Sequence, residues 1–458
     1  MTYFADFGLA EPICRALAAK GYTEPTPIQT QAIPVVMAGR DLCGIAQTGT
    51  GKTAAFALPT IDKLAKAPKA LTRGGVRTLV LSPTRELASQ IAESFTQYGK
   101  FMRLSVTTVF GGVPIARQER IMAHGVDVLV ATPGRLIDLI DRGAIDLRRV
   151  EVLILDEADQ MLDLGFIHAL KRIVTLLPKT RQTLFFSATM PKAIEDLAAR
   201  YLTDPVKVSV KPAATTVERV TQAVTFVNQG EKPALLQMVL RGEGVDRALV
   251  FSRTKHGADR IVRQLGNAGI EAAAIHGNKS QGQRERALDM FKKGQVRVLI
   301  ATDIAARGID IDAVSHVINY ELPNVPESYV HRIGRTARAG AGGSAIAFCA
   351  DDERPFLRDI EKLTRTKVDV LPLPEDFRSQ VAKTAAVEKA APPVARDVDP
   401  RSMAARPHGG GGRRGGSGGG GGRGAGGGSG KGSGGYTGRG PARDPRVVVN
   451  PVRSRGPR

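Results

Sequence analysis

The chain is poor in cysteine and contains no long apolar stretch. Its 458 residues include only Cys14, Cys43 and Cys349, which lie far apart. An odd number at these spacings suits neither a disulfide framework nor a zinc site, so we expect reduced thiols, no structural metal and a cytoplasmic protein. No run approaches the ~20 apolar residues that span a bilayer. The N-terminal residues also lack the apolar segment of a secretory signal.

Acidic residues are also scarce, since 45 of them stand against 65 lysines and arginines. The resulting formal charge of +20 indicates a polyanionic partner, nucleic acid before membrane. More than half of this excess lies between residues 401 and 458, where twelve basic residues accompany one acid, Asp444. This glycine-rich stretch has almost nothing to bury, so we expect residues 376–458 to form a disordered basic tail.

Apolar runs of strand length alternate with amphipathic stretches between residues 20 and 350, which is typical of a parallel α/β sheet. The expected strands fall into two sets, at 78–82, 127–131, 152–156 and 183–187, and at 248–252, 272–276, 296–301 and 316–320.

The two sets repeat each other at one offset. "TLVLSPT" at 78–84 aligns with "ALVFSRT" at 248–254, and "VLVAT" at 128–132 aligns with "VLIAT" at 298–302, both 170 residues apart. Short apolar runs can coincide by chance, but two matches at one offset favour a duplicated α/β domain. We therefore expect a first domain at 1–208, a linker at 209–218 and a second domain at 219–375.

A glycine-rich loop, A-Q-T-G-T-G-K-T at 46–53, follows an apolar segment and precedes a helix-forming one. Such a turn presents backbone N–H groups to phosphate at a helix N-terminus. Lys52 would reach the β- and γ-phosphates, and Thr53 would ligate Mg²⁺. The strict pattern has glycine where Ala46 stands, so an ordinary glycine-rich turn is the alternative. The second copy has no such loop, and one nucleotide site is expected.

The segment "VEVLILDEADQML" at 150–162 starts as a buried strand and ends in three acids. The C-terminal ends of strands are where α/β sheets bind ligands. Beside a phosphate loop, Asp156 would hold Mg²⁺ and Glu157 would orient and deprotonate the attacking water. The alternative is that Asp156, Glu157 and Asp159 only favour the start of the following helix.

D-E-A-D at 156–159, after A-x-T-G-x-G-K-T at 46–53, resembles the DEAD-box family of RNA helicases, in which alanine is usual at position 46. Further motifs of that family occur in order from residue 4 to 338. The short N-terminus and Gly/Arg-rich tail are most similar to the bacterial RhlE-type branch. The resemblance implies two tandem RecA-like domains with parallel sheets flanked by helices, which bind ATP and Mg²⁺ between them.

The resemblance also implies which residues surround the nucleotide. "GYTEPTPIQ" at 21–29 is similar to the adenine-recognition element, where the Gln29 amide matches one edge of adenine. Phe4 would stack on the base, although Phe7 is a nearby rival. The expected nucleotide-binding residues are Phe4, Gln29, Ala46, Gln47, Thr48, Gly49, Thr50, Gly51, Lys52, Thr53, Gly308 and Asp310.

The family's catalytic arginines match Arg335 and Arg338 in "HRIGRTAR", and His331 would link this segment to the acidic motif. "SAT" at 187–189 would couple hydrolysis to strand separation, with Ser187 and Asp159 as the expected pair and Thr189 beside them. The alternatives are that "HRIGRTAR" is an ordinary basic helix and that "SAT" is a tripeptide without a special role.

The RNA contacts implied by the family lie at strand ends of both domains, where small hydroxyl residues, backbone N–H groups and arginines suit phosphate and sugar. They are Pro83, Thr84, Arg85, Gly111, Gly112, Thr132, Pro133, Gly134, Arg135, Arg253, Thr254, Gly277, Gln281, Arg284 and Thr302. Alone, any of these would be a plain turn or solvated surface.

The expected activity is RNA-stimulated ATP hydrolysis that locally unwinds short RNA duplexes and remodels RNA or RNA–protein complexes. An ATP-gated RNA clamp with little unwinding and a DNA helicase of related architecture are the alternatives. Single-stranded and duplex RNA are the expected partners, with ribosomal precursors or the RNA-decay machinery as plausible settings. The basic tail would tether RNA, or would be a solvated linker.

Overall fold

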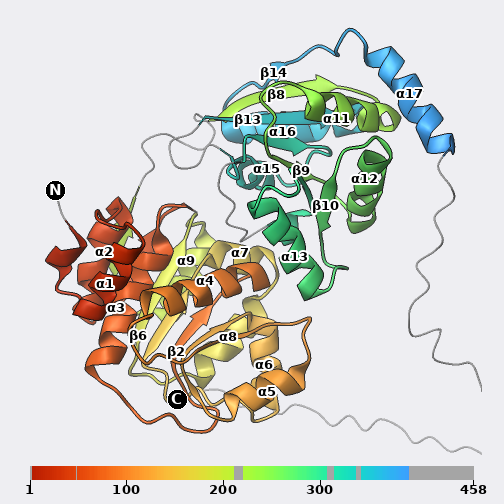
Figure 1. Cartoon of the computed structure of the whole chain (residues 1–458). Helices are drawn as coiled ribbons and strands as arrows, with labels where there is room; N and C mark the ends of the chain where they lie inside the picture. The colour runs from red at the N-terminus through yellow and green to blue at the C-terminus, as the bar shows by residue number, and fades with distance from the viewer. Residues whose placement is uncertain (1–2, 48, 211–219, 307–313, 337–341, 391–458) are drawn as a thin grey trace, which may run out of the picture. The chain divides into compact units, whose positions relative to one another are not determined.

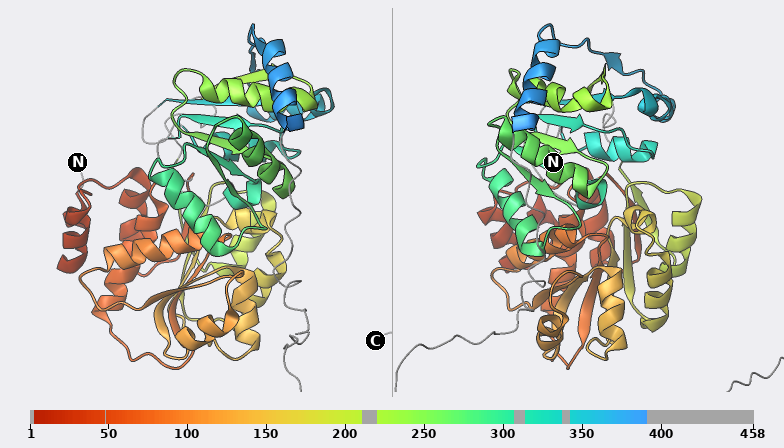
Figure 2. Two further views of the ribbon diagram at one scale, coloured as in Figure 1. Left: turned by 45° about the vertical axis from the view of Figure 1, so that its right-hand side comes forward. Right: turned by 90° about the vertical axis from the view of Figure 1, so that its right-hand side faces the viewer.

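The computed structural model describes residues 3–47, 49–210, 220–306, 314–336 and 342–390 (Figure 1). It contains two seven-stranded parallel sheets, and each has helices on both faces (Figures 1 and 2). This confirms the expected fold class of two tandem RecA-like domains. The central strands Val152–Leu155 and Ala248–Phe251 are apolar and buried throughout, as expected for a parallel sheet that is covered on both faces.

The first sheet has the strand order β3-β4-β2-β5-β6-β1-β7. Its strands are β1 Leu42–Ile45, β2 Val76–Leu81, β3 Val106–Val109, β4 Val126–Ala131, β5 Val152–Leu155, β6 Gln182–Ser187 and β7 Val206–Ser209. The helices of this half are η1 Phe4–Phe7, α1 Glu11–Ala19, α2 Pro27–Met37, α3 Lys52–Lys66, α4 Arg85–Tyr98, α5 Ile115–Met122, α6 Pro133–Asp141, α7 Ala158–Asp163, α8 Ile167–Leu176 and α9 Lys192–Tyr201.

The second sheet has the order β10-β11-β9-β12-β13-β8-β14. Its strands are β8 Val220–Phe226, β9 Ala248–Phe251, β10 Ala272–Ile275, β11 Val298–Ala301, β12 His316–Asn319, β13 Gly343–Cys349 and β14 Asp369–Val370. Its helices are η2 Gln229–Glu231, α11 Lys232–Arg241, α12 Lys255–Asn267, α13 Gln281–Lys292, α14 Asp303–Ala306, α15 Pro326–Ile333, η3 Asp351–Glu353, α16 Arg354–Thr364 and α17 Phe377–Ala390.

The two sheets share one topology and one register, as a duplication requires. Each strand of one order has its counterpart at the same place in the other, β2 matching β9 and β4 matching β11. Thr78 pairs with Val128 in the first sheet, and Ala248 pairs with Val298 in the second. Each residue of the second pair lies 170 positions after its equivalent in the first pair. All eight expected strands are present, with ends shifted by one or two residues.

The prediction that disorder begins at residue 376 is wrong for residues 377–390, which form the helix α17. Phe377 is 2% exposed and belongs to the apolar cluster that includes Leu235 of α11. The Gln380 amide donates to Gln237 Oε1 at 2.8 Å. The sequence pattern did not predict this helix, because its few apolar residues are spaced among lysines and alanines. The expected tail from residue 391 onward lies outside the described residues.

The other expected boundaries stay predictions. The first sheet ends with β7 at Ser209 and the second begins with β8 at Val220. Most of the expected linker lies outside the described residues.

Candidate nucleotide-binding and RNA-contact sites

The glycine-rich loop leaves β1 and enters α3 at Lys52, so the helix N-terminus lies at the carboxyl edge of the sheet. Gly49 and Gly51 have φ of 83° and 89°, a left-handed conformation that favours glycine. A Cβ on Gly51 would also lie 2.4 Å from Gln29 Nε2. Lys52 is 5% exposed, and its ammonium donates to the carbonyl of Ala46 at 3.0 Å. The loop therefore combines two left-handed glycines with a buried lysine at the start of α3.

The loop is joined to the start of α2 by two side chains. Thr26 Oγ1 donates to Thr50 O at 2.8 Å, and Gln29 Nε2 donates to Gly51 O at 3.1 Å. Gln29 Oε1 also accepts from Thr26 N, which completes a capping box. Within the loop, Thr50 Oγ1 donates to Gln47 O at 2.7 Å. Gln29 thus holds the phosphate loop while it lines the pocket, and each end of its amide keeps capacity for a second partner.

The acids after β5 are buried beside this loop. Asp156 is 2% exposed, and its Oδ1 accepts from Glu157 N at 3.0 Å. Burial raises the pKa of Asp156 to about 7; Lys52 opposes this shift, and Glu157 adds to it. Glu157 has φ 55° and ψ 53°, which is strained for a residue with a Cβ. A strained acid next to a buried one at a strand end is typical of a functional site.

Asp159 contacts the loop after β6, but not through the expected residue. Its Oδ2 accepts from Ala188 N at 3.1 Å, from Thr189 N at 2.9 Å and from Thr189 Oγ1 at 3.0 Å. The predicted Ser187–Asp159 pair is wrong, because the Ser187 hydroxyl is buried with no hydrogen-bond partner in the described structure. Ser187 contributes its carbonyl instead, which accepts from Ala46 N at 3.0 Å.

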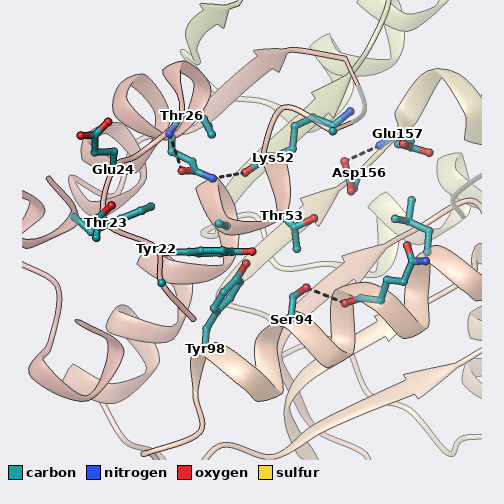
Figure 3. A pocket seen from close by; sticks show the side chains of 18 residues that line it. Tyr22, Thr23, Glu24, Thr26, Lys52, Thr53, Ser94, Tyr98, Asp156 and Glu157 are labelled. Atoms are coloured by element: carbon teal, nitrogen blue, oxygen red, sulfur yellow. Dashed lines mark hydrogen bonds between the residues drawn. The ribbon is translucent and has the colours of Figure 1, made fainter. Parts of the chain in front are cut away.

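Residues of these elements line a pocket of about 550 Å³ (Figure 3). Its lining includes the predicted Phe4, Gln29, Gly49, Gly51, Lys52, Thr53, Asp156 and Glu157. Phe4 is 5% exposed and packs edge-on against its rival Phe7, so it belongs to the apolar core as well as to the pocket. Thr48, Gly308 and Asp310 lie outside the described residues.

The pocket has lining residues that the sequence analysis missed. They include Tyr22 and Glu24 within the 21–29 segment and Gln90, Ser94 and Tyr98 of α4. Tyr22 and Tyr98 turn their hydroxyls toward each other (Figure 3). Burial, followed by Tyr22, raises the pKa of the Tyr98 hydroxyl. The spacing of Gln90, Ser94 and Tyr98 at four residues was the available signal, since it places all three on one helix face.

All nine predicted RNA contacts of the first domain lie just beyond the carboxyl ends of β2, β3 and β4. Thr84 caps α4 by accepting from Leu87 N at 3.3 Å. Arg85 packs on the Gly112 turn, where an added Cβ would lie 1.9 Å from its guanidinium, and Arg135 donates to Val113 O at 3.1 Å. Burial lowers the pKa of Arg85. Pro83, Gly111 and Thr132 lie in the loops after these strands, and Pro133 and Gly134 begin α6.

The second domain repeats part of this arrangement. Thr254 caps α12 by accepting from Gly257 N at 3.0 Å, just as Thr84 caps α4. Thr302 follows β11 as Thr132 follows β4, and their N–H groups donate to the last residues of β10 and β3. Gln281 and Arg284 lie in the first turn of α13, and Gly277 precedes it.

Arg253 has a structural role that the sequence analysis missed. Its guanidinium donates to Leu322 O at 3.2 Å and to Glu353 Oε1 at 2.8 Å. Glu353 is 1% exposed, and it also pairs with the fully buried Lys232 at 2.5 Å. A buried carboxylate needs such partners. Arg253 therefore completes a buried ion cluster, with about a third of its side chain left exposed.

The three arginines of "HRIGRTAR" differ in their surroundings. Arg332 is 1% exposed and pairs with Asp303 through two bonds of 2.5 and 2.8 Å, so it holds α15 against α14. His331 and Arg335 line a small cavity beside it. Helix α15 ends at Ile333, and Arg335 follows in a turn. Arg338 lies outside the described residues.

Within the described ranges, no three His, Cys, Asp or Glu side chains are grouped to hold a metal ion. No helix among these residues has the length and apolar character needed to cross a bilayer.

Comparisons with known proteins agree with this geometry. Residues 26–197 match the DEAD/DEAH box helicase family, and residues 230–340 match the helicase conserved C-terminal domain. The chain is 44% identical over 379 residues to the RNA helicase CrhR of Synechocystis, which covers 82% of this chain and 75% of CrhR. It is 42% identical over 374 residues to the DEAD-box ATP-dependent RNA helicase CshA of Bacillus cereus, covering 82% and 70%.

Two solved structures are also similar. Dbp5 of S. cerevisiae, bound to RNA and ADP BeF3, has a TM-score of 0.71 and 30% identity, covering 84% of this chain and 100% of that one. Mss116p, bound to single-stranded RNA and AMP-PNP, has a TM-score of 0.73 and 26% identity, covering 83% and 81%.

Proposed function

The chain belongs to the DEAD-box family of ATP-dependent RNA helicases, and from this premise we propose which of its residues carry out the reaction. It is an RNA-stimulated ATPase that unwinds and remodels RNA. The roles of individual residues, the part played by Mg²⁺ and the cellular setting are our proposals.

The first domain holds the nucleotide through its phosphate loop. The N–H groups of residues 47–53 would bind phosphate oxygens, with Lys52 countering their charge. Gln29 would read the adenine edge with the second donor and acceptor of its amide, and Phe4 would pack beside the base. Glu157, held at the pocket wall by its αL backbone, would orient the attacking water and accept its proton.

The donor set at this pocket fits Mg²⁺. The cation is commonly held by one or two carboxylates together with substrate phosphates, and Asp156 and Thr53 line the same pocket. Asp156 is buried, and a cation bound here would stabilise its ionised form. When bound, Mg²⁺ would neutralise charge on the phosphates.

The second domain would supply Arg335 and Arg338 to the charge that develops on the transferred phosphoryl group. His331 would link them to the acidic motif, and Gly308 and Asp310 would approach the ribose. The strand-end loops of both domains would hold RNA by phosphate and sugar, including its 2′-hydroxyls. In the second domain we expect Thr254 to contribute more to RNA binding than Arg253, because the Arg253 guanidinium already donates to Glu353.

Asp159 and Thr189 would couple hydrolysis to strand separation, because their bond joins the acidic motif to the loop after β6. The RhlE-type branch, the cytoplasmic location, and ribosomal precursors or decay machinery as partners stay predictions from the sequence resemblance.

One observation carries the assignment of the ATP site. Lys52, Thr53, Asp156, Glu157 and Gln29 come from three separate stretches of the chain and line one pocket at the carboxyl edge of one sheet.

The test is ATP hydrolysis without nucleic acid, with single-stranded RNA and with single-stranded DNA, at fixed salt. We expect strong stimulation by RNA alone. Glu157→Gln should lower kcat by roughly 10²–10⁴-fold while nucleotide affinity is kept. Glu195→Gln on the exposed face of α9 makes the same chemical change away from the pocket and should have no effect. Equal losses in both variants would refute the role of Glu157.

A further inference from the structure

Basic and aromatic side chains meet on the surface where α1 and the end of α4 pack together. The Arg15 guanidinium lies 3.8 Å from the centre of the Phe101 ring, and Lys100 Nζ lies 5.6 Å from it. Lys20 Nζ lies 5.8 Å from the Tyr22 ring and 5.6 Å from the Tyr98 ring. We call Arg15, Lys20, Tyr22, Lys100 and Phe101 the α1–α4 patch.

The patch differs from the other cation–aromatic contacts of the described chain. The described residues form eight such contacts: three join two residues of the patch, a fourth joins Lys20 to the Tyr98 ring, and four lie in the second domain. Phe101 and Tyr22 are 36% and 44% exposed, whereas Phe251 and Tyr320 in the second domain are 1% and 7% exposed. Phe226 and Phe356, the rings of the two remaining contacts, are partly buried against the apolar core of the second domain. The rings of the patch are therefore the more available to a ligand.

The cations of the patch are also available. Among the described residues, Arg15, Lys20 and Lys100 form no ion pair with an acid, and Lys20 donates only to the amide oxygen of Gln97. All three are exposed. Exposed cations beside exposed rings suit a ligand that carries both negative charge and flat aromatic faces. A single strand of RNA has this chemistry, since its phosphates meet the cations and its bases stack on the rings.

The patch is separate from the proposed RNA track at the carboxyl ends of the strands. Arg85 begins α4 and Tyr98 ends it, so the 14-residue length of this helix separates the track from the patch. At 1.5 Å per residue this is about 20 Å, which corresponds to roughly six nucleotides of a strand with the rise of a duplex.

We propose that the α1–α4 patch is a second RNA-binding surface, which holds the part of a longer RNA that extends beyond the track. This inference rests on the proposed function, in which the track holds RNA. Tyr22 both lines the nucleotide pocket and belongs to the patch, so RNA held there lies against the wall of the ATP site.

The test compares full-length variants in their affinity for single-stranded RNAs of 6 and 20 nucleotides, with a non-hydrolysable ATP analogue and across a salt series. Arg15→Glu with Lys100→Glu reverses two charges of the patch. Arg149→Glu with Lys179→Glu reverses two exposed charges that precede β5 and β6 at the opposite edge of the sheet, and serves as the matched control. The basic tail is present in every variant, so its contribution cancels.

Relative to the control, the patch variant should bind the 20-nucleotide RNA about tenfold more weakly. Its slope of log K against log salt should be smaller by about 1.4, the value for two lost phosphate contacts on a single strand. The 6-nucleotide RNA can occupy the track alone, so its affinity should match the control. If the wild-type protein does not bind the 6-nucleotide RNA, the proposed track itself is refuted, and this outcome is distinct from a failure of the patch.

A second pair of variants tests stacking without changing charge. Phe101→Ala should weaken the 20-nucleotide RNA severalfold, and Phe101→Trp should keep its affinity. Equal losses for the two RNA lengths, or a Phe101→Ala variant that binds the long RNA as wild type does, would overturn the proposal. Thermal unfolding of each variant confirms that the comparison is made on folded protein.

Discussion

The contact between Asp159 and Thr189 gives a sharp prediction, because the sequence and the structure favour different partners for this acid. Asp159 Oδ2 accepts three hydrogen bonds, one of them from Thr189 Oγ1 at 3.0 Å. Hydrogen bonds to a charged group are worth about 1.5–3 kcal/mol. Thr189→Val keeps the shape of the side chain and removes one of these bonds, so it should destabilise the first domain by about that amount.

Ser187→Ala should behave oppositely. The Ser187 hydroxyl is fully buried and has no hydrogen-bond partner in the described structure, so its removal leaves no group newly unsatisfied. The carbonyl that accepts from Ala46 is retained by any residue. We expect this variant to be neutral or slightly more stable.

Urea unfolding followed by circular dichroism measures the difference in stability. The number of RNA strands displaced per ATP hydrolysed, the coupling ratio, measures the link between hydrolysis and strand separation. Thr189→Val should lower both the unfolding midpoint and the coupling ratio, and Thr189→Ser should restore much of each by returning the hydroxyl. The reasoning is refuted if Ser187→Ala lowers the coupling ratio as much as Thr189→Val does.

The remaining predictions concern pH and the end of the chain. Burial raises the pKa of Asp156 from 3.8 to about 7, so between these values the folded protein binds more protons than the unfolded one. In the absence of Mg²⁺ and nucleotide, the contribution of Asp156 to stability should therefore fall as pH rises from 4 to 7. The difference in Tm between wild type and Asp156→Asn should vary across this window, and a constant difference would contradict it. Truncation after residue 390 should raise the apparent KM for RNA and leave saturated kcat nearly unchanged. With ~5 of the thirteen basic residues removed in contact with RNA, the lost salt slope would be about 3.5. A collapse of kcat would contradict the tether. Phe377→Ala should lower stability by about 3–5 kcal/mol, because the ring is buried in the cluster around α11, and a change below 1 kcal/mol in urea unfolding would show that α17 is dispensable.

The sequence alone determined the features that depend on local pattern. Each of the eight strands predicted from apolar runs is present in the structure. The offset of 170 residues between the two sets predicted two sheets of one register. The phosphate loop and the acids after β5 were recognisable because parallel strands bring their carboxyl ends to one edge. Chemistry at the ends of successive strands therefore follows from the order of residues along the chain.

Tertiary structure decided what depends on the direction of a side chain and on distant neighbours. Ser187 ends β6 and Thr189 follows two residues later, and only the fold determines that Thr189 meets Asp159. Arg253 is a plausible RNA contact in sequence, yet Glu353, a hundred residues away, engages its guanidinium. The partners of α17 and of the α1–α4 patch are equally remote in sequence. Pattern specifies which face of an element is apolar, whereas packing specifies which polar groups meet, because those contacts depend on segments that the local sequence does not contain.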